Sequence, residues 1–271
     1  MKNWFILKKL AWVSLLLIII SCQTIPPEWE NLAINQKSKI KIINNKITSN
    51  DFSFVVFGDS REGKAVLDKI IENINQLIPS PLFVVHLGDM VLSGKKNEYQ
   101  QFLSQINKLS VPVIGVAGNH DLHGKGTLYY REIFGPDNFY FDYSNYRFIF
   151  LNNASAKLSD NQLWWLEELL SETKKTKFLF MHIPPNLIQV RSSFKKDAKF
   201  LKLIKGKATY LFAGHIHNYQ KFENEGVTYI ISGGGGAKLN YHALTLGDYV
   251  HHFILVEIKN NKVSDKLIEI K

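Results

Sequence analysis

Cysteine is nearly absent from this chain: Cys22 is the single cysteine among 271 residues, so no intramolecular disulfide can stabilise the fold. The chain also lacks an internal repeat and a basic stripe interleaved with aromatic residues. We therefore interpret the formal net charge of +9 as a solvated basic surface, and we expect no nucleic-acid binding. With 45% hydrophobic residues, the chain is long enough to bury one sizeable core.

Acidic residues are missing from the first 27 positions, where lysines precede an apolar segment at residues 10–20. This segment is too short for a comfortable membrane span and is typical of an export signal, so we predict a signal peptide at residues 1–21. Cys22 follows Ile19-Ile20-Ser21, which resembles a bacterial lipoprotein processing site, and we predict its lipidation. The alternative is an uncleaved anchor helix with an incidental cysteine. Both interpretations predict a protein that is exported and anchored to a bacterial membrane.

The region after Cys22 divides into a tether and a folded domain. Residues 22–50 are polar, and we interpret them as a lipidated N-terminus and tether that contains one early strand at residues 39–43. From residue 51 onward, apolar strands alternate with helical patterns. Strands are expected to end at residues 57, 87 and 117, with helices at residues 64–77 and 97–109 between them. This order predicts a buried, mostly parallel sheet.

The remaining sequence predicts further strands and helices of the same domain. A hairpin is expected from residues 138–143 and 147–151, and a helix is expected after Ser159-Asp160. Further strands are predicted at residues 177–181, 208–213, 227–232, 251–259 and 262–270, with a helix at residues 194–204. We interpret residues 51–271 as one catalytic domain of the α/β class, with two mixed sheets packed face to face and flanked by helices.

Five short polar motifs follow apolar runs along the chain. Ligands bind in open α/β sheets at the carboxyl ends of the strands, and these motifs occupy that position in the predicted sheets. The motifs are Gly58-Asp59, Gly88-Asp89, Gly118-Asn119-His120-Asp121, His182 and Gly214-His215-Ile216-His217. Each alone is a weak signal, but their joint occurrence at strand ends predicts that their side chains meet.

The side chains of these motifs have the chemistry of a metal site. Carboxylate and amide oxygens combined with imidazole nitrogens suit Mn, Fe or Zn better than Ca or Mg. Two such metals, about 3.5–4 Å apart, can clamp an in-line displacement at phosphorus. The candidate ligands are Asp59, Asp89, Asn119, His182, His215 and His217. His120 is a candidate proton donor to the leaving oxygen, and we expect Asp121 to orient its ring.

In these motifs the sequence resembles the calcineurin-like metallophosphoesterase superfamily, and it is most similar to the bacterial branch related to purple acid phosphatases and cyclic-nucleotide phosphodiesterases. The resemblance implies a four-layer α/β/β/α fold, two metal ions and a metal-bound hydroxide as nucleophile. It also implies that Asp89 bridges the metals and that His120 protonates the leaving group. The first metal would be held by Asp59 and His217, and the second by Asn119, His182 and His215.

The sequence departs from the family pattern at one ligand. The family motif Asp-x-His corresponds here to Asp59-Ser60-Arg61, and arginine cannot ligate a metal. Purple acid phosphatases replace this histidine by a tyrosine three residues after the bridging aspartate, where this chain has Leu92. We therefore predict a weaker first metal site. Arg61 is expected either to contact the substrate phosphate or the water of the first metal, or to form an ion pair with a nearby carboxylate.

These features predict a membrane-tethered enzyme that hydrolyses phosphate mono- or diesters. One alternative is a cyclic-nucleotide or lipid-linked phosphodiesterase with the same fold, and another is a degenerate binding lipoprotein that has lost efficient catalysis. The expected partners are a phosphoester substrate and the membrane. Other residues allow weaker interpretations. His86 is expected to be a hydrogen-bonded core histidine, and residues 233–236 either bring the backbone close to the metals or form a flexible turn.

Overall fold

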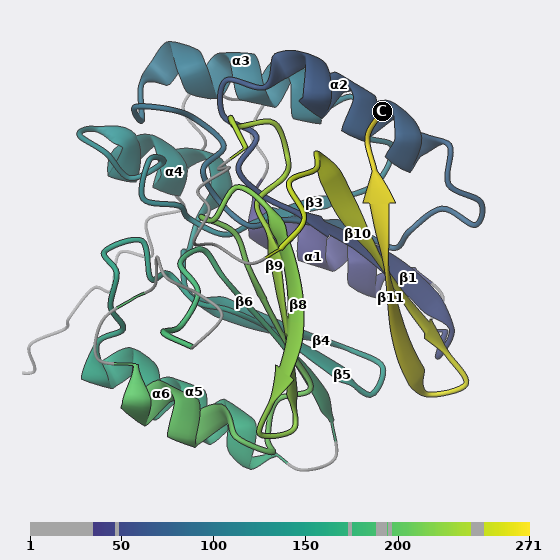
Figure 1. The fold of residues 1–271 in the computed structure, drawn as a ribbon, viewed down its shortest axis with the longest axis vertical. Helices are drawn as coiled ribbons and strands as arrows, with labels where there is room; N and C mark the ends of the chain where they lie inside the picture. The colour runs from purple at the N-terminus through teal and green to yellow at the C-terminus, as the bar shows by residue number, and fades with distance from the viewer. Residues whose placement is uncertain (1–34, 47–48, 173–174, 188–193, 195–196, 240–246) are drawn as a thin grey trace, which may run out of the picture.

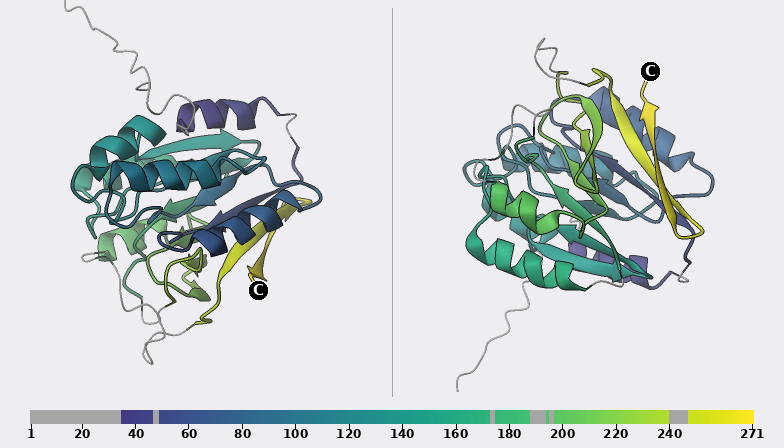
Figure 2. Two further views of the ribbon diagram at one scale, coloured as in Figure 1. Left: turned by 90° about the horizontal axis from the view of Figure 1, so that it is seen from above. Right: turned by 60° about the horizontal axis from the view of Figure 1, so that its bottom comes forward.

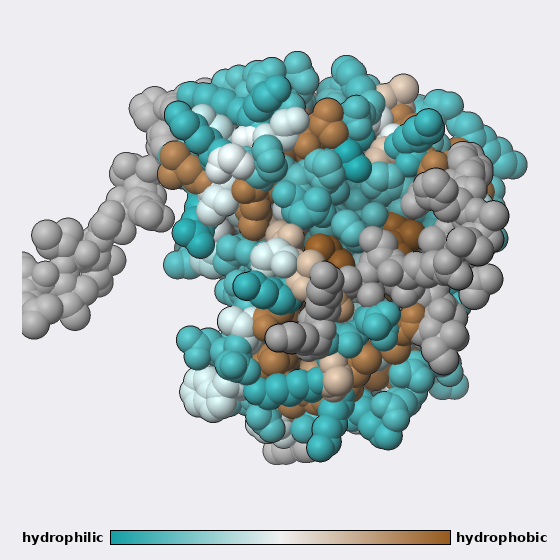
Figure 3. Space-filling model, turned by 60° about the vertical axis from the view of Figure 1, so that its left-hand side comes forward, coloured by the Kyte–Doolittle hydropathy of each residue, from teal (hydrophilic) through white to brown (hydrophobic). Residues whose placement is uncertain are grey.

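The computed structural model describes residues 35–46, 49–172, 175–187, 194, 197–239 and 247–271. The predicted signal peptide and Cys22 lie outside these residues. Among the helices within these ranges, none has the length and apolarity that a membrane crossing requires. The face shown in Figure 3 is mostly hydrophilic, with hydrophobic residues interspersed among polar ones.

Two mixed sheets form the centre of the molecule (Figure 1). The first has the strand order β11-β10-β1-β2-β3, in which β1, β2 and β3 are parallel and β10 is antiparallel to both of its neighbours. Its strands are β1 (Phe52–Phe57), β2 (Val84–His86), β3 (Val113–Gly115), β10 (His252–Lys259) and β11 (Lys262–Glu269). The predicted parallel order of the first three strands is confirmed.

The second sheet has the order β4-β5-β6-β7-β9-β8, with a parallel centre and antiparallel edge strands. Its strands are β4 (Phe139–Tyr143), β5 (Tyr146–Phe150), β6 (Thr176–Met181), β7 (Tyr210–Ala213), β8 (Tyr219–Asn224) and β9 (Val227–Ser232). The predicted hairpin is β4–β5, with a tight turn between Tyr143 and Tyr146.

The core between the two sheets is rich in phenylalanine. Phe54 of β1 stacks on Phe83, with ring centroids 5.2 Å apart, and meets Phe148 and Phe178 of the other sheet edge-on at 5.5 and 5.3 Å. Phe180 and Phe212 extend this cluster and are fully buried. Aromatic side chains bury large apolar areas and dominate the energetics of such a core. This layer fixes the two sheets against each other.

Helices cover the outer faces of both sheets (Figures 1 and 2). On the first sheet lie α2 (Lys64–Asn75), α3 (Lys96–Ile106) and α4 (Gly126–Phe134), which form one apolar cluster with β1 and β2. On the second sheet lie α5 (Asp160–Ser171) and α6 (Ala198–Ile204), which pack on β6 and β7. The predicted face-to-face sandwich flanked by helices is confirmed.

One predicted element is wrong: residues 39–43 form part of a helix, α1 (Gln36–Asn44), and not a strand. The alternating lysines and isoleucines of this short segment fit a strand, but Ile40 and Ile43 pack against the core while Ile42 is 47% exposed. Asn35 caps the helix, since its side chain accepts the backbone N–H of Ser38.

Other boundaries also differ from the prediction. The helix expected at residues 194–204 begins at Ala198, and Phe194 instead forms an isolated bridge with Pro185. Two elements of the structure, α4 and β8, were not predicted from the sequence. The first turn of α4 has no side-chain cap, and β8 is a half-exposed edge strand, so each carries a weak sequence signal.

Candidate metal centre

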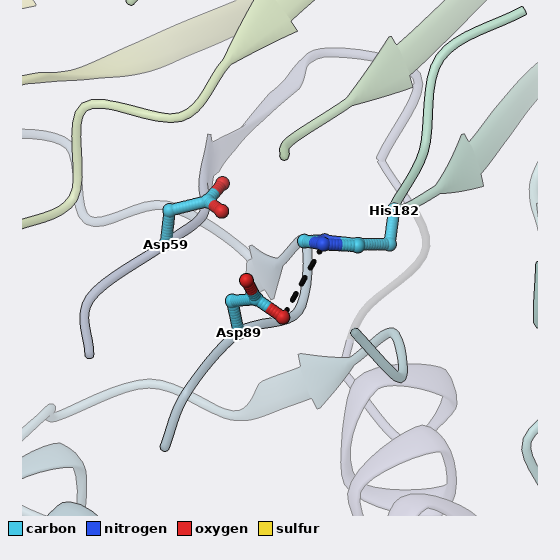
Figure 4. Close-up of side chains that lie close together, drawn as sticks. All are labelled: Asp59, Asp89 and His182. Atoms are coloured by element: carbon cyan, nitrogen blue, oxygen red, sulfur yellow. Dashed lines mark ion pairs between the residues drawn. The ribbon is translucent and has the colours of Figure 1, made fainter. Parts of the chain in front are cut away.

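The predicted ligands meet at one edge of the sandwich. Asp59 follows β1 by two residues, Asp89 follows β2 by three, and His182 follows β6 directly. Their ligand atoms lie within 4.8 Å of one another, and all three side chains are buried (Figure 4). Two parallel strand sets, one from each sheet, therefore deliver their carboxyl ends to a common point, as the sequence predicted.

Asp59 presents a buried oxygen that needs a cation. Its Oδ2 atom accepts the backbone N–H of His215 at 2.8 Å, while Oδ1 is buried without a hydrogen-bond partner. An unpaired buried carboxylate oxygen is costly unless a positive charge or a donor satisfies it. A buried oxygen without a hydrogen bond, in a set of two carboxylates and one imidazole whose ligand atoms lie within 4.8 Å of one another, fits a site for a divalent cation (Figure 4).

The ligands of the second metal position, defined by Asn119, His182 and His215, converge closely. Oδ1 of Asn119 lies 3.0 Å from Nε2 of His182 and 3.1 Å from Nδ1 of His215, and the two ring nitrogens are 3.3 Å apart. Nδ1 of His182 donates to the carbonyl of Leu87 at 2.8 Å, which leaves the lone pair on Nε2. Such a backbone partner fixes the tautomer that ligates a metal.

Electrostatics separates the two imidazoles of the second metal position. Burial and the neighbouring His182 lower the pKa of His215 to about 3, so His215 is neutral and can ligate a metal. Burial disfavours the charged form of His182, but the carboxylates of Asp89 and Asp59 outweigh this effect and raise its pKa. The carboxylates therefore make the region around Nε2 of His182 favourable for a positive charge. Oδ1 of Asp89 lies 3.3 Å from this nitrogen.

The first metal position, defined by Asp59 and His217, contains the guanidinium of Arg61. Nδ1 of His217 donates to the carbonyl of Lys238 at 2.8 Å, and its Nε2 lies 3.5 Å from Oδ1 of Asp59. Arg61 places Nη2 3.4 Å from that Nε2 and places Nε 3.4 Å from Oδ2 of Asp89. The ion pair expected for Arg61 is thus present, with Asp89 as its partner.

His120 and Asp121 do not form the expected pair. The Asp121 carboxylate accepts four backbone N–H groups from two loops that carry predicted ligands, the loop after β2 and the loop after β3, at distances of 2.8–3.2 Å. Nδ1 of His120 instead lies 2.6 Å from the carbonyl of Leu92. The prediction that Asp121 orients this ring is therefore wrong, because the Asp121 side chain is fully buried among backbone N–H groups while the His120 ring is partly exposed beside Leu92 and Asp89.

Comparison with known proteins identifies this arrangement. A family model described as calcineurin-like phosphoesterase matches residues 52–219, which is more than half of the chain. The chain belongs to the calcineurin-like phosphoesterase family.

Three curated relatives have names that describe phosphoester hydrolysis. A probable cyclic nucleotide phosphodiesterase of Synechococcus is 28% identical over 163 residues, which cover 55% of this chain and 62% of the relative. A glycerophosphodiester phosphodiesterase of Enterobacter lignolyticus is 28% identical over 168 residues, which cover 55% of this chain and 60% of the relative. A human serine/threonine-protein phosphatase is 26% identical over 255 residues, which cover 79% of this chain and 81% of the relative. The chain thus spans about three fifths of the first two relatives.

Solved structures agree on the fold. The purple acid phosphatase of yellow lupin seeds superposes with a TM-score of 0.70 at 17% identity, covering 82% of this chain and 52% of that chain. At this identity the likeness shows the fold alone. It confirms the two-sheet α/β architecture that the resemblance implied.

The ligand loops of this phosphoesterase hold unusual backbone conformations. Asp59, Asp89 and His215 have φ values of 61°, 55° and 69°, in the left-handed region that non-glycine residues rarely adopt. Such residues cost about 1–3 kcal/mol each and persist where the surrounding structure determines them. Gly88, with φ of 92°, precedes Asp89, and a Cβ there would lie 2.6 Å from the backbone nitrogen of Gly118. Close approach of two ligand loops explains this glycine.

His86 links two ligand loops of the phosphoesterase from below. Its Nδ1 accepts the backbone N–H of Gly88 at 3.2 Å, so Nε2 carries the proton and donates to Oγ of Ser60 at 2.9 Å. Burial, together with the charge of His182, lowers the pKa of His86 to about 3 and keeps the ring neutral. The prediction of a hydrogen-bonded core histidine is confirmed, and its partners place it between the Asp59 and Asp89 loops.

The glycine run at residues 233–236 packs tightly against the Asp59 loop. Gly235 N–H donates to the carbonyl of Gly58 at 2.8 Å, and Ala237 N–H donates to the carbonyl of Asp59 at 2.7 Å. A Cβ on Gly63 would lie 2.2 Å from backbone atoms of Gly236. The glycine run thus approaches the backbone of the Asp59 loop closely, and its approach to the metals stays a prediction.

A groove adjoins the site of the phosphoesterase. It has a volume of about 530 Å³ and runs between α2 and α3 from the loops that follow β1 and β2. Leu92, whose carbonyl contacts His120, lies at its site end together with Ser60. Leu67 and Phe102 line it with apolar atoms, and Lys64, Gln101 and Lys108 line it with polar groups. Its volume is in the range of small-molecule sites.

Proposed function

We propose that this phosphoesterase hydrolyses phosphate mono- or diesters in a metal-dependent reaction, as an exported protein tethered to a bacterial membrane. The observation that carries the proposal is the convergence of Asn119, His182 and His215, whose donor atoms lie 3.0–3.3 Å from one another, with Oδ1 of Asp89 3.3 Å from Nε2 of His182. A divalent metal bound there would polarise a phosphoryl oxygen and acidify water. The remaining chemistry is assigned to side chains of the chain.

His120 is positioned to donate a proton to the leaving oxygen. The carbonyl of Leu92 can only accept, so Nδ1 of His120 carries a proton. The other ring nitrogen, Nε2, lies 3.9 Å from Oδ2 of Asp89 and so faces the site. The side chain is 32% exposed, which leaves it accessible to a substrate.

Arg61 is positioned to bind a phosphoryl oxygen. Its guanidinium is 15% exposed, stays protonated, and carries more N–H groups than its contacts with Asp89 and His217 use. Charge-assisted hydrogen bonds from arginine to phosphate are short and strong. We therefore expect Arg61 to hold the substrate phosphoryl group close to His120, because both side chains face Oδ2 of Asp89.

The diester reading is favoured by two of the relatives, which are named as phosphodiesterases. The metal-loaded protein should be assayed with p-nitrophenyl phosphate, bis(p-nitrophenyl) phosphate and a cyclic nucleotide. Turnover of at least one ester, lost in Asp89→Asn, would support the proposal. A lipid-linked phosphate should be assayed as well. If the folded, metal-loaded protein hydrolyses none of these substrates, the result would favour the alternative of a binding lipoprotein.

The proposed membrane anchor rests on the position of Cys22 after an apolar leader. Mass spectrometry of the protein from bacterial membranes should find an N-terminus at Cys22 with attached acyl chains. Cys22→Ser should abolish acylation and leave the precursor uncleaved. An acyl-free wild-type protein that begins at Met1 would contradict the lipoprotein form.

A further inference from the structure

Arg61 stands where the family motif has a ligating histidine, and its side chain enters the site rather than solvent. The Arg61 backbone N–H donates to the Asp89 carbonyl at 3.1 Å, which attaches its loop to the Asp89 loop. The side chain is only 15% exposed. Its Nε atom is buried and makes no hydrogen bond, so the ionic contact with Asp89 is its compensation.

The guanidinium faces two of the three atoms that a first metal needs. Oδ2 of Asp89 lies 3.4 Å from Nε, and Nε2 of His217 lies 3.4 Å from Nη2. Because Nδ1 of His217 donates to Lys238, the lone pair of His217 is on Nε2 and is directed at the guanidinium. The third atom, Oδ1 of Asp59, makes no hydrogen bond and lies 3.5 Å from Nε2 of His217.

The charge of Arg61 also opposes a metal at this position. Arginine stays protonated in proteins, and it has no lone pair to offer a metal. A divalent ion between Asp59 and His217 would lie beside a permanent positive charge in a buried site, where like charges repel strongly. The loss of one imidazole ligand and the gain of one fixed positive charge therefore both weaken metal binding at the first metal position.

The second metal position does not share the contacts of this guanidinium with His217. The Arg61 side chain contacts Glu62, Asp89 and His217, and no lysine or arginine side chain among the described residues forms a hydrogen bond or ion pair with Asn119 or His182. The donor atoms of Asn119, His182 and His215 lie 3.0–3.3 Å from one another. Oδ1 of Asp89 adds a fourth ligand atom 3.3 Å from Nε2 of His182.

We propose that this phosphoesterase holds one tightly bound divalent metal per chain, at Asp89, Asn119, His182 and His215, and that the Arg61 guanidinium replaces the first metal as the second positive centre. The assignment of that centre to a phosphoryl oxygen rests on the proposed function. The metal count does not, because it is measured without turnover.

The first experiment counts metal in the full chain and in three variants at Arg61. Each protein is loaded with Mn²⁺, desalted and subjected to elemental analysis, and electron paramagnetic resonance distinguishes an isolated ion from a coupled pair. Wild type and Arg61→Lys should retain one isolated ion, while Arg61→His should retain two coupled ions. Arg61→Ala should gain a second ion only at higher Mn²⁺ concentration.

Several results would overturn the proposal. They are two tightly retained ions in wild type, one ion in Arg61→His, or an Arg61→Ala protein that matches wild type at every Mn²⁺ concentration. Circular dichroism confirms that each variant is folded before its metal is counted. If wild type binds one ion but hydrolyses no phosphoester, the metal proposal stands and the proposed function fails.

A second experiment uses two histidines of one loop as a matched pair. His217→Asn removes a ligand of the first metal position and should leave one ion per chain. His215→Asn removes a ligand of the second metal position and should reduce the retained metal at least tenfold. Loss of the tight ion in His217→Asn, with retention in His215→Asn, would overturn the assignment.

Discussion

The carboxylate of Asp121 holds the backbone of Asp89: its Oδ2 atom accepts the Asp89 amide N–H at 2.9 Å. The same oxygen accepts the N–H of Gly118, while Oδ1 accepts those of Met90 and Val91. Burial and the nearby Asp89 carboxylate raise the pKa of Asp121 to about 7. Asp121 thus ties two ligand loops together, and its part in the site is to position Asp89.

Asp121→Asn should destabilise the fold and loosen the metal. The amide nitrogen of asparagine cannot accept the N–H groups that one carboxylate oxygen now accepts, and each buried donor left unpaired costs about 1–3 kcal/mol. We expect urea unfolding to show a loss of about 2–4 kcal/mol, with reduced metal retention. Asp160→Asn is the control, because that side chain is 91% exposed and should stay near wild type. An Asp121→Asn protein with wild-type stability would contradict the role of Asp121.

His120→Asn should lower turnover without changing the metal content. A positioned general acid contributes about 10²–10⁴-fold, and its contribution grows as the leaving group becomes more basic. We therefore expect a small loss with p-nitrophenyl esters and a large loss with alkyl esters, measured as kcat at saturating metal. Equal losses for both leaving groups would show that His120 does not donate the proton.

Gly63→Ala should disturb the site through packing. The new Cβ would lie 2.2 Å from backbone atoms of Gly236, so the glycine run must move away from the Asp59 loop. We expect a loss of about 1–3 kcal/mol in urea unfolding together with weaker metal retention. Gly124→Ala is the control, since no atom lies within 4 Å of its Cβ and its φ of +57° makes it costly for stability alone. Unchanged metal retention in Gly63→Ala would exclude this coupling.

The location of the site could be predicted from the sequence, because its ligands follow apolar strands directly. Asp59, Asp89 and His182 come within three residues of strand ends, and parallel strands bring such positions to one edge. The role of Asp121 could not be predicted in this way. Its partners are backbone N–H groups of another loop, which leave no trace in residue type.

Short elements were the other source of error. The alternating lysines and isoleucines before residue 44 match a strand period, yet burial of Ile40 and Ile43 requires a helix. The buried Gln36 anchors α1, since its side chain donates to the carbonyl of Pro136 and accepts the N–H of Gly115. Both partners lie far along the chain, so tertiary contacts override the local period.

His252 should make the protein lose stability as the pH falls. Burial is the main reason that its pKa is lowered to about 4 from an ordinary value of 6.5, so the unfolded chain binds a proton that the folded chain does not. The stability from this group is full above pH 6.5 and falls by up to about 1.4 kcal/mol per pH unit down to about pH 4. Urea unfolding at several pH values should show a shallower slope in His252→Phe, even though that variant also loses the hydrogen bonds of His252 to Ser232 and Val250. Equal slopes in wild type and His252→Phe would show that another group causes the acid sensitivity.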